Sequence, residues 1–328
     1  MNILLWAVFA TVLLVLLFLG LFTASIASKI EKGFAPNGQF IEIDGTRIHY
    51  VDQGQGPVLL MIHGLSGQLR HFSHSLMDRL TDDFRVVLID RPGCGYSSRL
   101  ANGSSGIKAQ GALVARFIET LDLGRPILVG HSLGGAVALS TALDHPERVG
   151  GLALIAPLTH FEESVPSVFA AMAIRSKPLR WLFSRTLLIP LAILKKDETL
   201  ELVFGPEVAP PNFPTAGGGL LSLRPAAYRA ASDNLLEISD ALPAMIEKYP
   251  SLPMPIGILY GNGDRILDWE KHGVAMRDKV RGLQLEIIPG GHMLPLTNVA
   301  ASARFIRSVA AAATTADAAS ESVAQADA

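Results

Sequence analysis

The residue types and spacing best suited to chemistry occur in the segment GHSLGG, residues 130–135. Ser132 lies between Gly130-His131 and Gly134, which is the G-x-S-x-G spacing of a nucleophile elbow. An apolar run precedes the segment and a helix-forming run follows it, so the hydroxyl would stand on a sharp strand-to-helix turn, where a helix N-terminus favours negative charge. The competing interpretation is a glycine-rich turn with an N-capping serine. The flanking strand and helix favour the nucleophile.

A serine hydroxyl is a weak nucleophile until a base removes its proton, and His292 is the candidate base. It lies within PGGHM, directly after the last apolar run, on a loop that would project over the edge of a sheet. Asp264 follows ILYGNG at the end of the preceding strand and would fix the imidazole tautomer, in the chain order Ser, acid, His. Asp268 is the alternative acid, and it also suits the N-cap of the next helix. The histidines interpreted as surface or packing residues are His71, His74, His145, His160 and His272.

Two fixed N–H donors are needed to stabilise the oxyanion that forms when a serine attacks a carbonyl group. The residue after the nucleophile, Leu133, would supply one of them. Leu65 would supply the other from the loop His63-Gly64-Leu65, which follows the apolar run VLLMI. Loss of one such donor typically costs about 3 kcal/mol of transition-state stabilisation.

The composition argues against a nucleic-acid-binding protein and against sites that need several cysteines. The 28 Lys and Arg against 30 Asp and Glu give a formal net charge of -2, which lacks the basic footprint of a nucleic-acid binder. Cys94 is the single cysteine, so neither an intrachain disulfide nor a multi-thiolate zinc site can form. The serine chemistry described above requires neither a metal nor an organic cofactor, and none is expected.

The elements that must position these residues alternate along the chain. A hairpin is predicted from two apolar segments, 40–43 and 47–51, around Asp44-Gly45. Six short apolar runs with the length of buried strands follow at 58–62, 85–89, 126–130, 151–155, 256–260 and 284–288. Helices are predicted at 70–80, 106–121, 133–143, 268–280 and 296–312. This βαβ pattern predicts an α/β fold with a mostly parallel sheet covered on both faces.

Two segments interrupt this pattern. Residues 159–253 contain no buried-strand run but several amphipathic pieces, which predicts a helical cap over a pocket. Its segment 165–194 is strongly apolar, but it contains four basic residues, Arg175 and Arg185 among them. Basic side chains are rare within membrane spans, so the segment is not interpreted as a second transmembrane helix. The tail, 310–328, consists mostly of Ala, Ser, Thr and acidic residues and is predicted to be disordered.

The N-terminal segment from Ile3 to Phe22 has no charged side chain and is long enough to cross the roughly 30 Å hydrocarbon layer. We interpret residues 1–28 as a transmembrane anchor, which predicts a protein of the bacterial inner membrane. A cleaved signal peptide is the alternative, because small residues near Ala27 have cleavage-like spacing. Lys29 and Lys32 favour a cytoplasmic catalytic domain over a periplasmic one. Residues 29–39 are predicted to be a linker.

Five motifs, HGLSG, DRPGCGYS, GHSLGG, GNGD and the final GGH, occur in the order found in the α/β-hydrolase superfamily, which the chain resembles over 40–309. The resemblance implies an eight-stranded sheet with an antiparallel second strand and a helical cap after the sixth strand. It implies that Asp90 and Arg91 brace a structural loop. Cys94 of that loop is expected to be a bystander.

Among the chemistries of this superfamily, a serine nucleophile indicates acyl transfer. The expected function is hydrolysis of carboxylic esters of a hydrophobic small molecule, with Ser132 forming an acyl-enzyme. The enzymatic alternatives are a C–C hydrolase of meta-cleavage products, a cofactor-free haloperoxidase-like hydrolase and a lipase acting on membrane lipids. A catalytically silent ligand-binding protein is the alternative from another class. The expected partners are the substrate and, through the N-terminal helix, a lipid bilayer; the sequence carries no signal for the oligomeric state.

Overall fold

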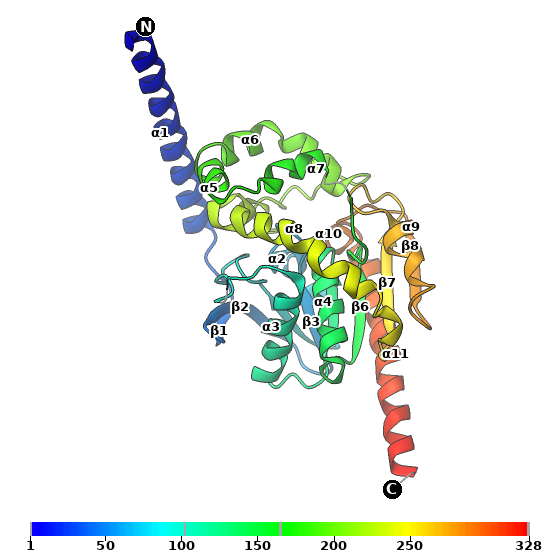
Figure 1. Ribbon diagram of the computed structural model, residues 1–328. Helices are drawn as coiled ribbons and strands as arrows, with labels where there is room; N and C mark the ends of the chain where they lie inside the picture. The colour runs from blue at the N-terminus through cyan, green and yellow to red at the C-terminus, as the bar shows by residue number, and fades with distance from the viewer. Residues whose placement is uncertain (1, 102, 164–165, 327–328) are drawn as a thin grey trace.

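The computed structural model describes residues 2–101, 103–163 and 166–326, and its centre is an eight-stranded sheet in the order β1-β2-β4-β3-β5-β6-β7-β8 (Figure 1). The strands are β1 (Gln39–Ile43), β2 (Thr46–Gln53), β3 (Val58–Ile62), β4 (Arg85–Ile89), β5 (Ile127–His131), β6 (Gly151–Ile155), β7 (Ile256–Gly261) and β8 (Gln284–Ile288). β2 pairs antiparallel with β1 and β4, and every other neighbouring pair is parallel. The predicted α/β fold, with its antiparallel second strand, is confirmed.

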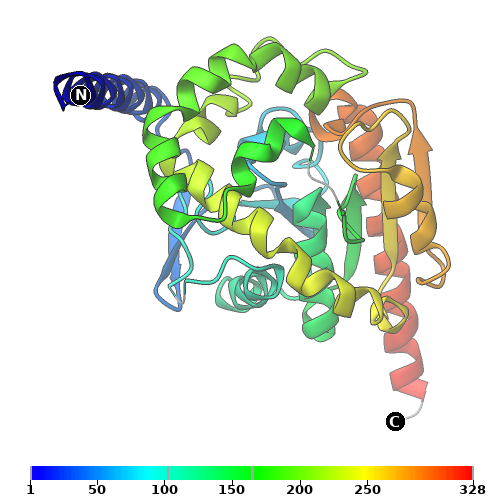
Figure 2. The ribbon, with the colours of Figure 1, turned by 45° about the horizontal axis from the view of Figure 1, so that its top comes forward.

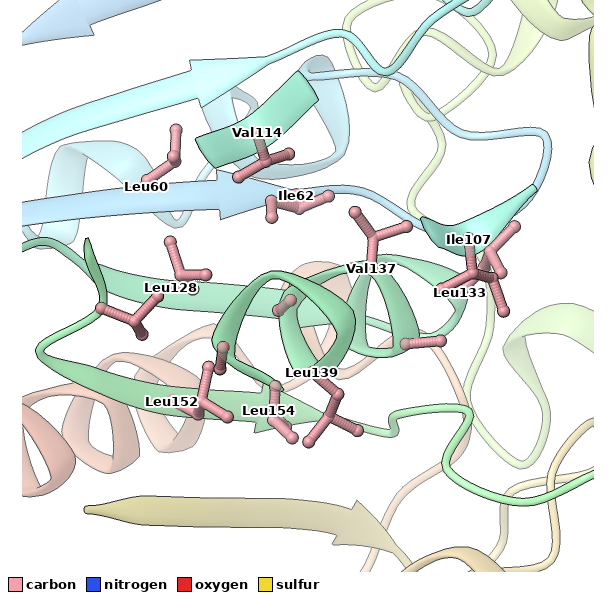
Figure 3. Packing of buried hydrophobic residues seen from close by; sticks show 14 of the residues in the cluster. Leu60, Ile62, Ile107, Val114, Leu128, Leu133, Val137, Leu139, Leu152 and Leu154 are labelled. Carbon is pink, nitrogen blue, oxygen red and sulfur yellow. The ribbon is translucent and has the colours of Figure 1, made fainter. Parts of the chain in front are cut away.

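Helices cover both faces of the sheet because its strands are apolar on both sides. Alternate residues of a strand face opposite layers: Leu128 packs in one cluster with residues of α4 (Leu133–Asp144), whereas Val129 packs in another with residues of α11 (Val299–Ala326). Figure 3 shows Val137 and Leu139 of α4 against side chains of β5 and β6. The other helices of the body are α2 (Arg70–Ser73), η1 (Met77–Arg79), α3 (Ile107–Thr120), η2 (Pro146–Arg148), α9 (Trp269–His272), η6 (Val274–Met276) and α10 (Leu294–Thr297).

Between β6 and β7 the chain forms a helical insertion, called the cap below, as the sequence predicted. Its elements are η3 (Ser167–Ala173), α5 (Lys177–Thr186), α6 (Leu188–Leu194), α7 (Lys196–Phe204), η4 (Gly219–Leu223), α8 (Pro225–Ile246) and η5 (Tyr249–Ser251). The cap arches over the edge of the sheet at which the parallel strands end (Figure 2). This is the edge that carries the candidate residues.

The two terminal helices differ from the predictions. Helix α1 (Asn2–Gly33) continues through the first part of the predicted linker 29–39. Ile30 is buried, so this part of the helix still packs against the rest of the protein. Helix α11 continues to Ala326, so the prediction of disorder is wrong for 310–326; residues 327–328 lie outside the described residues. Alanine has the highest helix propensity, and Ala313 is buried with the core, which explains the helix. Helix α1 is the one helix of the described chain that is long and apolar enough to cross a membrane.

Candidate active site

Ser132 occupies a strained turn between β5 and α4. Its φ of 54° and ψ of -123° lie in a region that non-glycine residues adopt at a cost of about 1–3 kcal/mol. Backbone hydrogen bonds hold the turn: the Ser132 N–H donates to the Ile155 carbonyl at 3.1 Å, and the Ser132 carbonyl accepts from the N–H of Leu158 at 3.0 Å. The side chain is therefore fixed at the carboxyl edge of the sheet, where it lines a cavity.

Two glycines allow this turn. A Cβ atom on Gly130 would lie 2.6 Å from the Cα of Gly135, and one on Gly134 would lie 2.0 Å from the Ile62 carbonyl oxygen. Both obstacles are backbone atoms, which cannot rotate away as a side chain can. The G-x-S-x-G spacing read from the sequence is thus a steric requirement of the elbow.

His292 is paired with a carboxylate. Its Nδ1 lies 2.7 Å from Oδ2 of Asp264, and the other oxygen, Oδ1, accepts from the N–H groups of Ile266 at 2.8 Å and Leu267 at 3.0 Å. The Asp264 side chain is fully buried, so this pair is shielded from solvent. The carboxylate can hold the proton on Nδ1, which leaves Nε2 free to accept one. Within the described residues no hydrogen bond joins Ser132 to His292, but both side chains line the same cavity.

The alternative acid, Asp268, lies elsewhere. Its carboxylate accepts from the Glu270 N–H at 2.8 Å and caps α9, as its sequence position suggested. On geometry, the pairing with His292 favours Asp264 over Asp268 as the candidate acid.

The two predicted oxyanion donors lie on either side of Ser132. Leu133 is the first residue of α4, so its N–H has no acceptor within the helix. The His63-Gly64-Leu65 loop approaches so closely that a Cβ on Gly64 would lie 2.9 Å from that of Ser132. Leu65 and Leu133 both line the cavity.

Arg91 fixes the orientation of that loop from behind. Its buried guanidinium donates to the carbonyl groups of His63 at 2.8 Å and Gly64 at 2.7 Å. Because C=O and N–H point in opposite directions across a trans peptide, the Leu65 N–H points away from Arg91. Arg91 also donates to Gln110 of α3 and to Asn234 of α8. These contacts fit the bracing role that the resemblance implied.

Asp90 braces the same region. Its carboxylate accepts from the N–H groups of Leu69 at 2.8 Å and Tyr96 at 2.9 Å, and it lies 2.7 Å from His49 Nδ1. Cys94 lies buried in this loop, and burial raises the pKa of its thiol. A buried thiol is a poor nucleophile, which agrees with its expected role as a bystander.

The sequence did not indicate the cap residues that support the site. Glu207 accepts from the Gly291 N–H and from Asn298 Nδ2, both at 2.8 Å, and so holds the loop that carries His292. Asn234 supports Arg91 from α8. A single polar residue within an amphipathic helix or a loop has no periodicity that would single it out before the chain is folded.

Two further histidines near the nucleophile are held neutral. Burial lowers the pKa of His63 and of His131 well below the ordinary value, and Arg91 lowers that of His63 further. His131 Nε2 donates to the His292 carbonyl at 3.0 Å. Both side chains act as neutral hydrogen-bonding groups, and the described residues contain no group of three or more His, Cys, Asp or Glu side chains placed to hold a metal ion.

The cavity beside Ser132 has a volume of about 790 Å³ and extends from the body into the cap. Most of its lining is apolar, with Phe169, Phe183 and Leu191 contributed by η3, α5 and α6. A pocket of this size and polarity accommodates a hydrophobic small molecule.

The chain is similar to known hydrolases and to a transferase component. It is 39% identical over 129 residues to the dihydrolipoyllysine-residue acetyltransferase component of an acetoin cleaving system from Cupriavidus necator, covering 39% of this chain and 34% of that protein. It is 37% identical over 118 residues to a 2-hydroxy-6-oxononadienedioate/2-hydroxy-6-oxononatrienedioate hydrolase from Burkholderia vietnamiensis, covering 34% of this chain and 41% of that protein. The matched segments thus span less than half of either relative.

The solved structure of a membrane phospholipase A, described as a bacterial virulence factor, is similar over nearly the whole length, with a TM-score of 0.65 and 25% identity over 94% of this chain and 97% of that one. The family model for the alpha/beta hydrolase fold matches residues 57–299, which include the elbow, the oxyanion loop and the His292 loop. The chain therefore belongs to the α/β-hydrolase family.

Proposed function

We propose that this hydrolase cleaves carboxylic esters of hydrophobic molecules through an acyl-enzyme on Ser132. The observation that carries the proposal is the strained elbow opening onto an apolar cavity that His292, paired with Asp264, also lines. Strain of this kind persists only where the surrounding structure enforces it, and it is typical of functional sites.

The mechanism uses only groups of this chain and water. His292 Nε2 takes the proton of Ser132 as Oγ attacks the ester carbonyl carbon, and the Leu65 and Leu133 N–H groups receive the oxyanion. Collapse of the tetrahedral intermediate breaks the ester bond, and the alcohol leaves with the proton from His292. Water, deprotonated by His292, then attacks the acyl carbon, and the acid is released as Ser132 Oγ leaves and takes back the proton from His292. Asp264 stabilises the imidazolium in both halves of the reaction.

The second part of the proposal is that α1 anchors the enzyme in a membrane. Residues 3–15 of α1 are exposed along their whole length although they are apolar, a surface that water disfavours. The likeness to a membrane phospholipase A supports an ester of amphiphilic character and a membrane location.

A C–C hydrolase is the second candidate, because a hydrolase of 2-hydroxy-6-oxononadienedioate is among the relatives. Such a substrate carries two carboxylates, and the cavity lining holds Arg175 and Lys195 together with the acidic Glu162 and Glu163. A meta-cleavage dienoate assayed beside a p-nitrophenyl ester series from acetate to palmitate separates the candidates. Turnover of the dienoate at a higher kcat/KM than every ester would replace the first proposal with the second.

The nucleophile is tested with a fluorophosphonate probe on the full chain in detergent. Wild-type protein should be labelled and should hydrolyse the esters, whereas Ser132→Ala should do neither. Ser222→Ala is the matched control, because Ser222 also lines the cavity but its hydroxyl donates to the Gly219 carbonyl. Labelling that persists in Ser132→Ala, or its absence in folded wild-type protein, would contradict the mechanism.

A further inference from the structure

Helix α1 has two halves with different surroundings. Residues 3–15 are exposed, but from Leu16 onward a stripe of partly or fully buried positions recurs every three or four residues and ends at Ile30. This is the spacing of one helix face. The face packs on the cap, where α1 contacts α5, α6 and η4, and Thr23 donates to the Thr186 carbonyl at 3.2 Å. Helix α1 is therefore joined to the cap before its apolar segment ends.

The length of the helix sets the depth of this contact. The uncharged segment 3–22 extends over about 30 Å at 1.5 Å per residue, which is the thickness of the hydrocarbon layer. Residues 16–22 form the last third of the segment, about 10 Å, and belong to the half that packs on the cap. A bilayer that holds 3–22 must then reach the adjoining surface of α5 and α6. Figure 1 shows these two helices beside the lower half of α1.

The surface at that depth is apolar. We define the apex patch as five exposed large apolar side chains of α5, α6 and their junction: Leu179, Leu182, Leu187, Ile193 and Leu194. Leu194 is 79% exposed and Ile193 is 60% exposed, so water surrounds both in the isolated chain. Exposed charged residues of both signs follow the patch after α6: Lys196, Asp197 and Glu198, the last in contact with Lys195 at 3.4 Å. Apolar side chains edged by charged and polar ones are typical of a surface that lies in a membrane interface.

Helix α6 also separates this patch from the cavity. Its Leu188 and Leu191 line the cavity beside Ser132, whereas Ile193 and Leu194 point to the outside. One helix thus lies between the membrane level and the proposed acyl pocket. A substrate entering beside α6 would pass from hydrocarbon to an apolar cavity without crossing water.

We propose that the apex patch is a docking surface for the bilayer that holds α1, and that the enzyme takes ester-linked amphiphiles from that bilayer into its cavity. The inference rests on the proposed esterase function and adds the substrate class, an acyl-chain lipid or lipid-like ester, and the side from which it enters. The patch contributes no group to the chemistry, so its removal affects membrane substrates alone.

Membrane contact is tested without catalysis in full-length Ser132→Ala protein reconstituted into phosphatidylcholine and phosphatidylglycerol vesicles. Lipids brominated on the acyl chains should quench the fluorescence of the tryptophan introduced by Leu194→Trp, measured as the difference from the same protein without this substitution. Both proteins retain Trp6, Trp181 and Trp269. No quenching of the introduced tryptophan, while Trp6 is quenched, would overturn the docking surface.

Substrate entry is tested with the double variant Ile193→Glu, Leu194→Glu. Its turnover of a long-chain ester embedded in vesicles should fall by about tenfold or more, because the charges keep α6 out of the interface, whereas turnover of soluble p-nitrophenyl acetate should remain within about twofold. Val208→Glu is the matched control: Val208 is 88% exposed, lies outside the patch and does not line the cavity. Its vesicle activity should match that of the wild type.

The outcomes separate the two proposals. Equal vesicle activity of the double variant and the wild type overturns the entry route and leaves the esterase intact. Equal losses on vesicles and on the soluble ester mean that the patch supports the fold, which also overturns it. Wild-type protein that hydrolyses neither substrate contradicts the esterase, and the quenching measurement then decides the docking surface alone.

Discussion

Replacing Asp264 with asparagine removes one charge and changes few atoms. Its Oδ1 accepts two backbone N–H groups, from Ile266 and Leu267, and its Oδ2 faces Nδ1 of His292. The asparagine oxygen has to remain on the two N–H donors, so the amide NH₂ faces the histidine. Nδ1 must then accept a hydrogen bond, and the proton moves to Nε2, the nitrogen that should take the proton of Ser132.

The size of the effect follows from these contacts. The opposite amide orientation gives up two hydrogen bonds of about 1 kcal/mol each and places NH₂ against two N–H donors, so it is populated at a few per cent or less. The imidazolium also loses its buried counter-charge. We therefore expect kcat of Asp264→Asn to fall by about 10³ to 10⁴, which corresponds to about 4 to 5.5 kcal/mol.

The assay is steady-state hydrolysis of p-nitrophenyl butyrate at pH 8, with thermal unfolding measured on the same samples. Asp268→Asn is the matched control, because it makes the same chemical change four residues away at a helix N-cap. Its kcat should remain within about twofold, since asparagine caps helices as well as aspartate does. More than a tenth of wild-type kcat in Asp264→Asn, or an equal loss in Asp268→Asn, would refute the assignment of the acid.

Three further predictions concern stability and the support of the site. Burial lowers the pKa of His71 to about 4 from 6.5, so the neutral imidazole contributes about 3 kcal/mol to the free energy of unfolding above pH 6.5, and this contribution is lost as the pH falls from 6.5 through 4. Urea unfolding between pH 7 and pH 4 should show this loss, and His71→Phe should make the free energy of unfolding depend less on pH. Asn234→Leu removes an acceptor of Arg91, so kcat/KM should fall by about five- to tenfold and unfolding free energy by about 2 kcal/mol; unchanged kinetics would mean that the cap does not support the oxyanion loop. Gly134→Ala forces a Cβ to 2.0 Å from the Ile62 carbonyl oxygen, so the protein should lose more than about 3 kcal/mol of stability and its activity, as thermal unfolding and ester hydrolysis would show.

The body of the fold was predictable because local sequence and tertiary structure agree there. The run 85–89 is apolar at every position but its first, and it forms β4 with the predicted bounds. Ser132 and His292 were identifiable for a related reason: Ser132 directly follows β5, His292 lies in the loop after β8, and parallel strands end at one edge of the sheet. Glycines mark these turns, since only glycine fits their backbone contacts.

Contacts between distant segments were not predictable. The pairing of Arg91 with Asn234 joins residues 143 positions apart, and no periodicity in α8 distinguishes this asparagine. The helical tail was missed for another reason. Low apolar content suggested disorder, but alanine needs little packing to remain helical, and Ala310 and Ala313 supply some against the sheet.

These missed contacts change the interpretation of the cap. A simple lid would contribute cavity walls alone, but this cap also holds both loops on which the proposed chemistry depends: Asn234 supports Arg91 behind the oxyanion loop, and Glu207 binds Gly291 beside the base. The same cap packs on α1, through Thr23 and Thr186. A force that displaces the cap relative to the sheet would therefore disturb the donors and the base together. Because α1 packs on α5, α6 and η4, docking on a bilayer would act on the element that holds both of these loops in place.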